Sequence, residues 1–295
     1  MIQHNYSTTK FECIVNEISL KRVSLNYRSL SLLFLISFFS QHLFAQTWDV
    51  GGFIGGTSYM GDLNPINPAK VNNLAFGAQV KRCFNPYWAL KLGLMHGTIE
   101  AKDANAKDAF AKQRNLSFYS PVTEISLQTE FNFFSYVPSI SKKWYTPYLF
   151  AGLGFVGFNP KAELGGTVYE LRTIGTEGQD PSHPYKNYAV SVPFGLGFKY
   201  NFTGKWSLIA EAGYRTVYSD YLDDVSNNYL TEEQLLGYGD EQFQSIRKRL
   251  SDRSMYGTAE YGSQRGDYRS RDSYMFVGLS VTYSFFKRGC PVVAY

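Results

Sequence analysis

Apolar and polar residues alternate along most of the chain after Gln46. Alternation with a period of two predicts a β-strand, because successive side chains point to opposite faces. The clearest segment sets Met275, Val277, Leu279, Val281, Tyr283 and Phe285 against Gly278, Ser280, Thr282 and Ser284. Eight such segments are found, at residues 47–58, 72–83, 87–99, 116–133, 145–158, 188–202, 205–217 and 272–286. The pattern predicts an all-β protein.

The connections between these segments alternate between short and long. The short ones are Phe84–Pro86, the residues around Pro138, and Thr203–Gly204. The other four have roughly 13, 16, 29 and 54 residues, and short turns on one side with long loops on the other are typical of outer-membrane barrels. We therefore expect an eight-stranded antiparallel transmembrane up-and-down β-barrel over residues 46–286, OmpA/OmpW-like, with a long fourth extracellular loop. Both termini would be periplasmic.

In such a barrel the apolar faces contact lipid and the polar faces point inward. An eight-stranded barrel has an interior that side chains can fill. We expect the inward charged residues to pair as a plug, and an ion path is the alternative. The residues of this predicted network are Lys91, Glu124, Glu130, Lys199, Glu211 and Arg215.

Composition agrees with a lipid-facing barrel. The chain has 23 Phe, 23 Tyr and 4 Trp, and its mean hydropathy of −0.25 is too polar for a bundle of membrane-spanning helices. All four tryptophans fall at the short-turn ends of segments, where a girdle of aromatic residues is expected: Trp48, Trp88, Trp144 and Trp206. A soluble lipocalin-like barrel has the same period, but the loop asymmetry favours the membrane.

The first 45 residues read as a signal peptide. A basic flank precedes an apolar stretch at residues 29–40, and Leu43-Phe44-Ala45 offers a cleavage site. The alternative is a single-span anchor, for which the apolar run is short. No Cys stands directly after the apolar run, as a lipoprotein signal would require. Residues 287–295 would form a periplasmic tail.

Candidate catalytic and metal-binding groups are sparse. His183 lies beside Ser182 and Asp180 in a turn-rich loop, and His96 continues the apolar face of its segment. Acidic residues at Asp62 and in the run from Asp220 to Asp224 lack the regular spacing of a dedicated Ca²⁺ loop. We expect no enzyme activity, no cofactor and no metal. A net charge of +4 without a concentrated basic face argues against nucleic acid as a partner.

Two other features concern the fourth loop and the cysteines. The loop contains a capping-box pattern at Thr231–Gln234 and the basic residues Arg247, Lys248, Arg249, Arg253, Arg265, Arg269 and Arg271. Those cations either pair with lipid phosphates or are simply solvated. Cys83 and Cys290 would both lie on the oxidising periplasmic side, so we hypothesise a disulfide between them.

Five segments stand out as motifs: GGTSYMGDL (55–63), TPYLF (146–150), FNPKA (158–162), GTEGQ (175–179) and SDYLDDVS (219–226). Together and in this order they resemble one known family, the PorG/SprG-type outer-membrane barrels associated with the type IX secretion system and gliding motility. The resemblance covers about residues 46–290 and brings no catalytic residues. It implies a structural component of the secretion machinery that contacts a periplasmic ring of PorK and PorN type.

The resemblance leaves two functions to separate. The first is a secretion-machine barrel whose periplasmic turns and tail bind a partner. The second is an independent surface or adhesion barrel that works through its long extracellular loops. In both, outer-membrane lipid surrounds the barrel, and no small-molecule substrate is expected.

Overall fold

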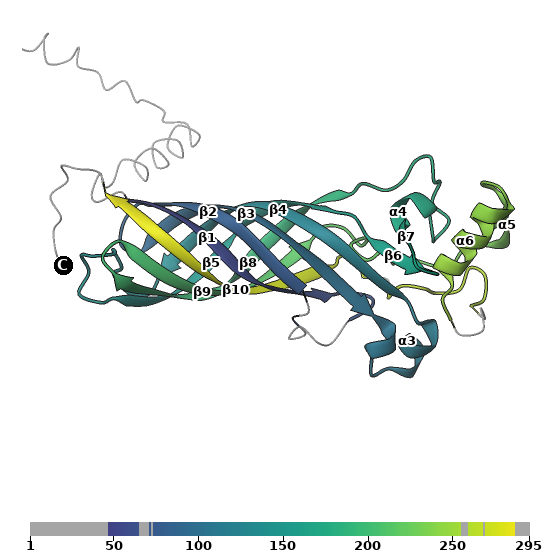
Figure 1. The fold of residues 1–295 in the computed structure, drawn as a ribbon, viewed down its shortest axis with the longest axis horizontal. Helices are drawn as coiled ribbons and strands as arrows, with labels where there is room; N and C mark the ends of the chain where they lie inside the picture. Colours follow the sequence, from purple (N-terminus) through teal and green to yellow (C-terminus); the bar gives the residue numbers. More distant parts are fainter. Residues whose placement is uncertain (1–46, 65–70, 72, 255–258, 268, 287–295) are drawn as a thin grey trace, which may run out of the picture. The chain divides into compact units, whose positions relative to one another are not determined.

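The computed structural model describes residues 47–64, 71, 73–254, 259–267 and 269–286. All of them belong to one compact unit, residues 43–295. Eight long strands make up most of it (Figure 1): β1 (Thr47–Met60), β2 (Asn73–Cys83), β3 (Trp88–Lys102), β4 (Ser117–Asn132), β5 (Tyr145–Phe158), β8 (Tyr188–Thr203), β9 (Trp206–Val217) and β10 (Ser273–Phe286). The predicted signal peptide and tail lie outside the described residues.

The eight strands close into a barrel. Their order is β3-β2-β1-β10-β9-β8-β5-β4, and β3 also pairs with β4, which leaves no open edge among them. Each neighbouring pair is antiparallel, with β1 and β10 in register from Thr47–Phe286 to Met60–Ser273. Closure pairs the backbone groups that lipid could not satisfy. The predicted fold class is confirmed, and the predicted segments match the strands to within three residues at each end.

Glycines allow the strands to approach closely inside the barrel. A Cβ on Gly51 would lie 2.2 Å from the backbone oxygen of Val281, and a Cβ on Gly55 equally close to that of Val277. A side chain at either position would therefore push β1 and β10 apart. This explains why the Gly-rich first segment alternates less cleanly than the others.

The barrel has two different ends. The turn end carries the short connections 84–87, 133–144 and 204–205 together with Thr47 and Phe286, and the loop end carries the long connections. Between them the outward side chains are large and apolar. Examples with about half or more of their surface exposed are Ile54, Leu92, Ile125, Leu153, Phe155, Leu196 and Leu279. So large a continuous apolar surface is built to contact lipid.

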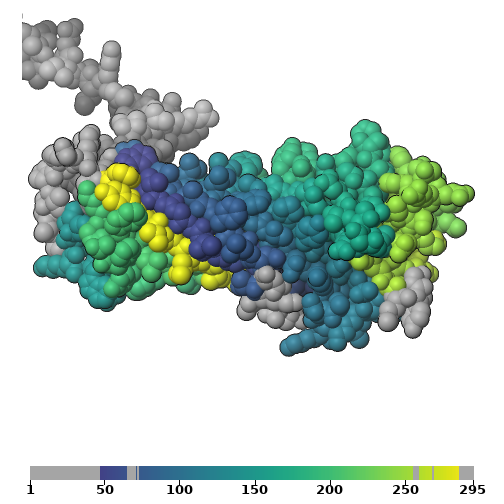
Figure 2. Space-filling view, viewed as in Figure 1, coloured from purple at the N-terminus to yellow at the C-terminus, as the bar shows by residue number. Residues whose placement is uncertain are grey.

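The loop end has secondary structure of its own, which the alternation pattern did not predict. It comprises the 3₁₀ helix η1 (Asp103–Asn105), α3 (Ala109–Arg114), the hairpin β6 (Lys161–Leu164) and β7 (Thr167–Glu170), α4 (Leu171–Ile174), α5 (Glu232–Leu236) and α6 (Glu241–Ser251). In Figure 2 the teal-green region that contains β6, β7 and α4 lies beside the yellow-green region of α5 and α6. The capping box at the start of α5 is confirmed, with reciprocal bonds between Thr231 and Gln234.

Among the described residues, no helix is long and apolar enough to cross a membrane.

Candidate functional site

The barrel interior is organised around Glu130 on β4. Its Oε2 lies 2.7 Å from the Nζ of Lys81 and 2.6 Å from that of Lys199, and its Oε1 lies 3.6 Å from the Nζ of Lys91. The side chain of Glu130 has no exposed surface. One carboxylate thus draws together cations from β2, β3 and β8.

A second set of contacts continues the network toward the loop end. Lys91 also pairs with Glu211 at 2.6 Å, and Glu211 accepts a hydrogen bond from the hydroxyl of Tyr148. Further along, Arg215 lies 3.7 Å from Glu124, which accepts from the hydroxyl of Tyr274. Buried charges require such partners, because an unpaired charge in a dry interior is very costly.

The structure brings all six predicted network residues into this arrangement. Two charged members were missed by the sequence analysis, Lys81 and Asp49, and both are buried and inward. Lys81 shares its parity with the inward Gln79 on the same strand, so the alternation of β2 could have identified it. Asp49 lies on the Gly-rich β1, whose facing the pattern did not define.

The space that remains inside the barrel is small. A cavity of about 20 Å³ is lined by residues that include Gln79, Gln128 and Arg215. The Nε2 of Gln79, the Oε1 of Gln128 and the Nε of Arg215 have no hydrogen-bond partner in the part of the chain that the structure describes. A volume of roughly 10–15 Å³ accommodates one water molecule, so this cavity suits one buried water bound to these groups. The interior is filled as a plug.

At the loop end, Arg114 joins three connections. Its guanidinium donates two hydrogen bonds to Asp103, at 2.8 and 2.9 Å, and one each to the backbone oxygens of Asp62 and Arg265. These residues belong to the β1–β2, β3–β4 and β9–β10 connections. We call these three connections, together with the β5–β8 connection that packs on them, the loop cap.

Two further arginines are buried in the loop cap. Arg265 pairs with Glu177 at 2.8 Å and also donates to the backbone oxygen of Asp224. Arg247 on α6 donates to the backbone oxygens of Gly175, Gln179 and Gln234. For these two residues, neither sequence-based alternative, lipid phosphate or solvent, holds: they are internal cross-links.

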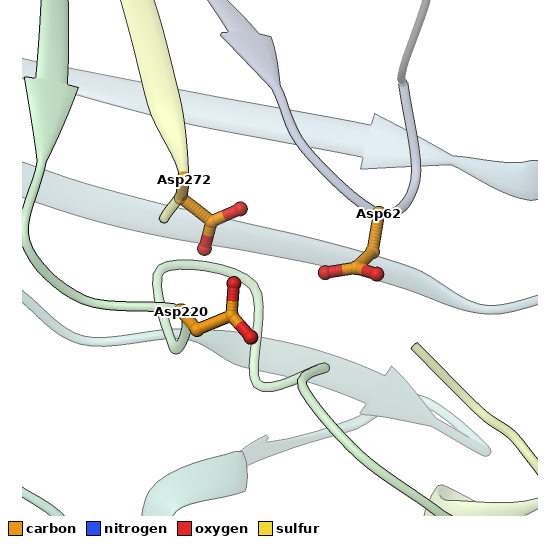
Figure 3. A group of neighbouring side chains, drawn as sticks. All are labelled: Asp62, Asp220 and Asp272. Carbon is orange, nitrogen blue, oxygen red and sulfur yellow. The ribbon is translucent and has the colours of Figure 1, made fainter. Parts of the chain in front are cut away.

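A cluster of carboxylates lies between the loop cap and the barrel. Asp62 follows β1, Asp220 follows β9 and Asp272 precedes β10, and one oxygen of each lies within 4.8 Å of the others. Figure 3 shows the three side chains converging. The sequence analysis named Asp62 and Asp220 but not Asp272, which stands alone in the sequence and is brought in by the closure of β10 against β1.

Burial sets the protonation of this cluster. It raises the pKa of Asp62 to about 7 and that of Asp220 to about 6, and it raises the pKa of Asp272 well above its ordinary value. Desolvation is the largest cause in each case, since it disfavours the charged form. The neighbouring carboxylates act in the same direction. At neutral pH the cluster therefore retains protons.

Hydrogen bonding gives independent support for a retained proton. The hydroxyl of Tyr59 lies 2.6 Å from the Oδ2 of Asp223 and 2.8 Å from the Oδ1 of Asp272. A phenol has one hydrogen to donate. If both contacts are hydrogen bonds, one of these carboxyls is protonated and donates to the Tyr59 oxygen. Three side-chain ligands are also fewer than the six to eight oxygens that Ca²⁺ takes.

The other candidate groups are not arranged for catalysis. In the exposed 180–183 turn, the Nδ1 of His183 faces both Asp180, at 2.9 Å, and Ser182, at 3.1 Å. A catalytic histidine uses one ring nitrogen for its acid partner and the other for the nucleophile. His96 points outward and contacts the Thr123 hydroxyl at 2.9 Å.

Cys83, at the end of β2, has no disulfide partner among the described residues, and its Sγ lies 3.6 Å from the Oδ2 of Asp49. Cys290 lies outside the described residues, so the Cys83–Cys290 disulfide stays a prediction. The strand register places Cys83 one strand away from Phe286, the last described residue before Cys290, because Thr47 pairs with both Cys83 and Phe286.

Comparison with known proteins finds similar solved structures at low identity. The N-terminal β-barrel domain of Pseudomonas aeruginosa OprF is 15% identical, with 81% of this chain and 97% of that one covered and a TM-score of 0.33. OprG of the same organism is 10% identical, with 82% of this chain and 97% of that one covered and a TM-score of 0.37. Yersinia pestis Ail, crystallised with the heparin analogue sucrose octasulfate, is 9% identical, with 82% of this chain and 100% of that one covered and a TM-score of 0.35. No curated protein matches the chain.

The family comparison is more specific. The model of a domain of unknown function, DUF6089, matches residues 27–244, which is most of the chain. The match includes β1 to β9 and the start of α6. The protein belongs to the DUF6089 family.

Proposed function

We propose that this protein is a non-enzymatic outer-membrane barrel that serves as a structural component of the type IX secretion machinery. In this proposal the turn end faces the periplasm and contacts a ring of PorK and PorN type. The loop cap faces outward. The resemblance of five segments to the PorG/SprG-type barrels is the reason for proposing a role in secretion. The geometry of the barrel is the reason for placing the partner-binding surface at the turn end.

The filled interior supports a structural role. Charge pairs around Glu130 and Glu211 occupy the centre of the barrel, and the cavity beside them holds about one water. A barrel without a wide lumen is poorly suited to passing a folded protein. Its contribution to secretion would come from binding other proteins.

The observation that carries the proposal is the ordered turn end. Tyr136 is buried at the turn end, where its amide donates to the backbone oxygen of Pro86 and its hydroxyl forms a hydrogen bond with the Ser207 hydroxyl at 2.7 Å. Asn132 donates to the same oxygen of Pro86. These bonds join the β2–β3 and β4–β5 connections to each other and to the start of β9. A preorganised surface binds a partner without a further cost of ordering.

Site-specific photo-crosslinking tests this assignment. Lys142 is exposed at the turn end, and Lys107 is exposed at the loop end. With a photoreactive amino acid at position 142, we expect an adduct with a ring protein in living cells, and with the same group at position 107 we expect none. Adducts from 107 alone, with the barrel folded in both variants, would overturn the proposal.

The loop cap gives a specific reason to keep the adhesion alternative. A cavity of about 920 Å³ opens there, lined by residues that include Lys102, Phe110, Arg114 and Asp267. A pocket of that size is large enough for a ligand. If deletion of the gene leaves secretion intact but removes surface binding of cells, this second function replaces the first.

A further inference from the structure

Two exposed cations stand against exposed tyrosines at the rim of the loop end. The guanidinium carbon of Arg271 lies 4.2 Å from the centre of the Tyr218 ring, and the Nζ of Lys186 lies 5.9 Å from the centre of the Tyr188 ring. The two rings are 52% and 59% exposed. Each cation is thus placed against an aromatic ring at the outer surface of the barrel.

The two pairs lie on neighbouring strands at the upper limit of the apolar surface. Tyr188 begins β8, and Tyr218 directly follows β9, with its amide bonded to the backbone oxygen of Val190 at 2.9 Å. Below them the outward residues are Val190, Phe194, Leu196, Leu208 and Ala210. Tyrosine at such a boundary marks the level of the lipid headgroups.

Two other basic residues of the same connection as Arg271 are already paired within the protein. Arg265 is buried against Glu177, and Arg269 pairs with Asp267 at 3.2 Å. Lys186 and Arg271 make no ion pair within the described part of the chain. The carboxylates of Asp62 and Asp272 near Arg271 are buried and point into the cluster. Both cations are therefore available to an anion outside the protein.

We infer that Lys186 and Arg271 bind the phosphate groups of a phosphorylated glycolipid in the leaflet that surrounds the loop end. A guanidinium matches two phosphate oxygens at once, and Tyr218 holds its plane in position. The ammonium of Lys186 adds a second charge beside the neighbouring strand. The tyrosine rings meet the apolar part of the same lipid. A phosphorylated lipid thereby accounts for both the exposed cations and the exposed tyrosine rings at the rim.

This inference rests on the proposed orientation, in which the loop end faces outward, so orientation needs its own measurement. We would label a Ser182→Cys variant on intact cells with a membrane-impermeant maleimide, because Ser182 is exposed in the loop cap. Labelling supports the outward orientation. Its absence from folded protein overturns the orientation, whereas lipid selectivity is measured separately on purified protein.

Lipid retention tests the inference directly. The purified barrel would be placed in phosphatidylcholine nanodiscs that contain either bisphosphorylated lipid A or its dephosphorylated form, and bound lipid would be counted by native mass spectrometry. We expect preference for the phosphorylated form, reduced about fivefold by each of Lys186→Gln and Arg271→Gln. The matched control is Lys107→Gln with Lys112→Gln, which removes two exposed charges elsewhere in the loop cap.

Two results would overturn the inference. One is equal retention of phosphorylated and dephosphorylated lipid by the unaltered protein. The other is undiminished retention of the phosphorylated lipid by the Lys186→Gln, Arg271→Gln double variant. Because both side chains are exposed, the variants are expected to fold, which the shift of the barrel on gels between heated and unheated samples would verify. Arg271→Lys should retain part of the preference, since the charge remains without the planar fork.

Discussion

The Nζ of Lys199 lies 2.6 Å from the Oε2 of Glu130, and neither side chain has more than 4% of its surface exposed. The two residues come from β8 and β4, which are not neighbours in the sheet because β5 lies between them. Their contact therefore crosses the interior rather than following the wall. Lys81 and Lys91 converge on the same carboxylate, so three buried ammonium groups share one negative charge, and Lys91 also pairs with Glu211.

Replacing Glu130 should destabilise the barrel strongly. Glu130→Gln leaves the shape almost unchanged but removes the charge that Lys81, Lys91 and Lys199 share. Removing one partner of a buried pair costs about 3–5 kcal/mol. Urea unfolding of the barrel in lipid vesicles would measure the loss.

The matched control is Glu163→Gln, the same change at an exposed position in the β6–β7 hairpin. Surface changes of this kind alter the free energy of unfolding by less than about 0.5 kcal/mol. If both variants unfold alike, the Glu130 hub does not stabilise the barrel as described.

The filled interior also predicts that the protein is electrically silent. With inward charges paired and a central cavity of about 20 Å³, no hydrated ion passes through the described barrel. In planar bilayers the purified protein should give no stepwise conductance at any moderate voltage. Regular unitary steps in proportion to the amount of protein would contradict the plug.

The strands could be predicted from the sequence because the constraint that forms them is local. Alternation along each strand reports which face meets lipid, and it placed Glu124, Glu130 and Lys199 correctly inward. It was weakest on β1, where glycines replace the side chains that would reveal a face. Asp49 was missed for that reason.

The loop cap could not be predicted in the same way, because its contacts join residues far apart in the chain. Arg265 and Glu177 are separated by 88 positions, and Asp62 meets Asp272 only when the barrel closes. Three of the five segments that resemble the PorG/SprG-type barrels contain residues of these contacts. Gly55–Leu63 contains Asp62, Gly175–Gln179 contains Glu177, and Ser219–Ser226 contains Asp220 and Asp224. Their sequence motifs correspond to cross-links within the cap.

The loop cap should be more stable in mild acid than in mild base. The pKa of Asp62 is raised to about 7 and that of Asp220 to about 6, from 3.8 in both cases, so the folded state holds protons that the unfolded state releases. This contribution to stability is fully present below about pH 4 and is lost as the pH rises toward 7.

Hydrogen exchange would reveal the effect. The amide of Leu222 donates to Asp272, so residues around it should open more readily at pH 8 than at pH 5 once the intrinsic exchange rates are corrected. Asp62→Asn should flatten this dependence. A peptide from β4 serves as the internal reference, and greater protection at pH 8 than at pH 5 would reverse the sign derived from the raised pKa values.

Arg247 should be required for the loop cap but not for the barrel. Arg247→Met keeps most of the side-chain volume and removes three hydrogen bonds to backbone oxygens. We expect faster proteolysis within residues 175–187 and 218–250, which lie outside the barrel strands, with the strands themselves protected. Arg249→Met, an exposed change on the same helix, should behave like the unaltered protein. Equal cleavage of the two variants would remove the cross-linking role.

The disulfide hypothesis has a direct test. The protein would be isolated from the outer membrane without reductant, alkylated, and its intact mass measured. If Cys83 and Cys290 are joined, neither cysteine gains an alkyl group. Alkylation of both would show two free thiols and would end the hypothesis.

Deletion of the gene, followed by comparison of secreted cargo in the medium, tests the proposed function most directly. The proposal predicts that type IX cargo disappears from the medium and returns when the gene is supplied on a plasmid. A plasmid copy carrying Arg249→Met should restore secretion equally well. Unchanged cargo in the deletion strain would contradict a role in the secretion machinery.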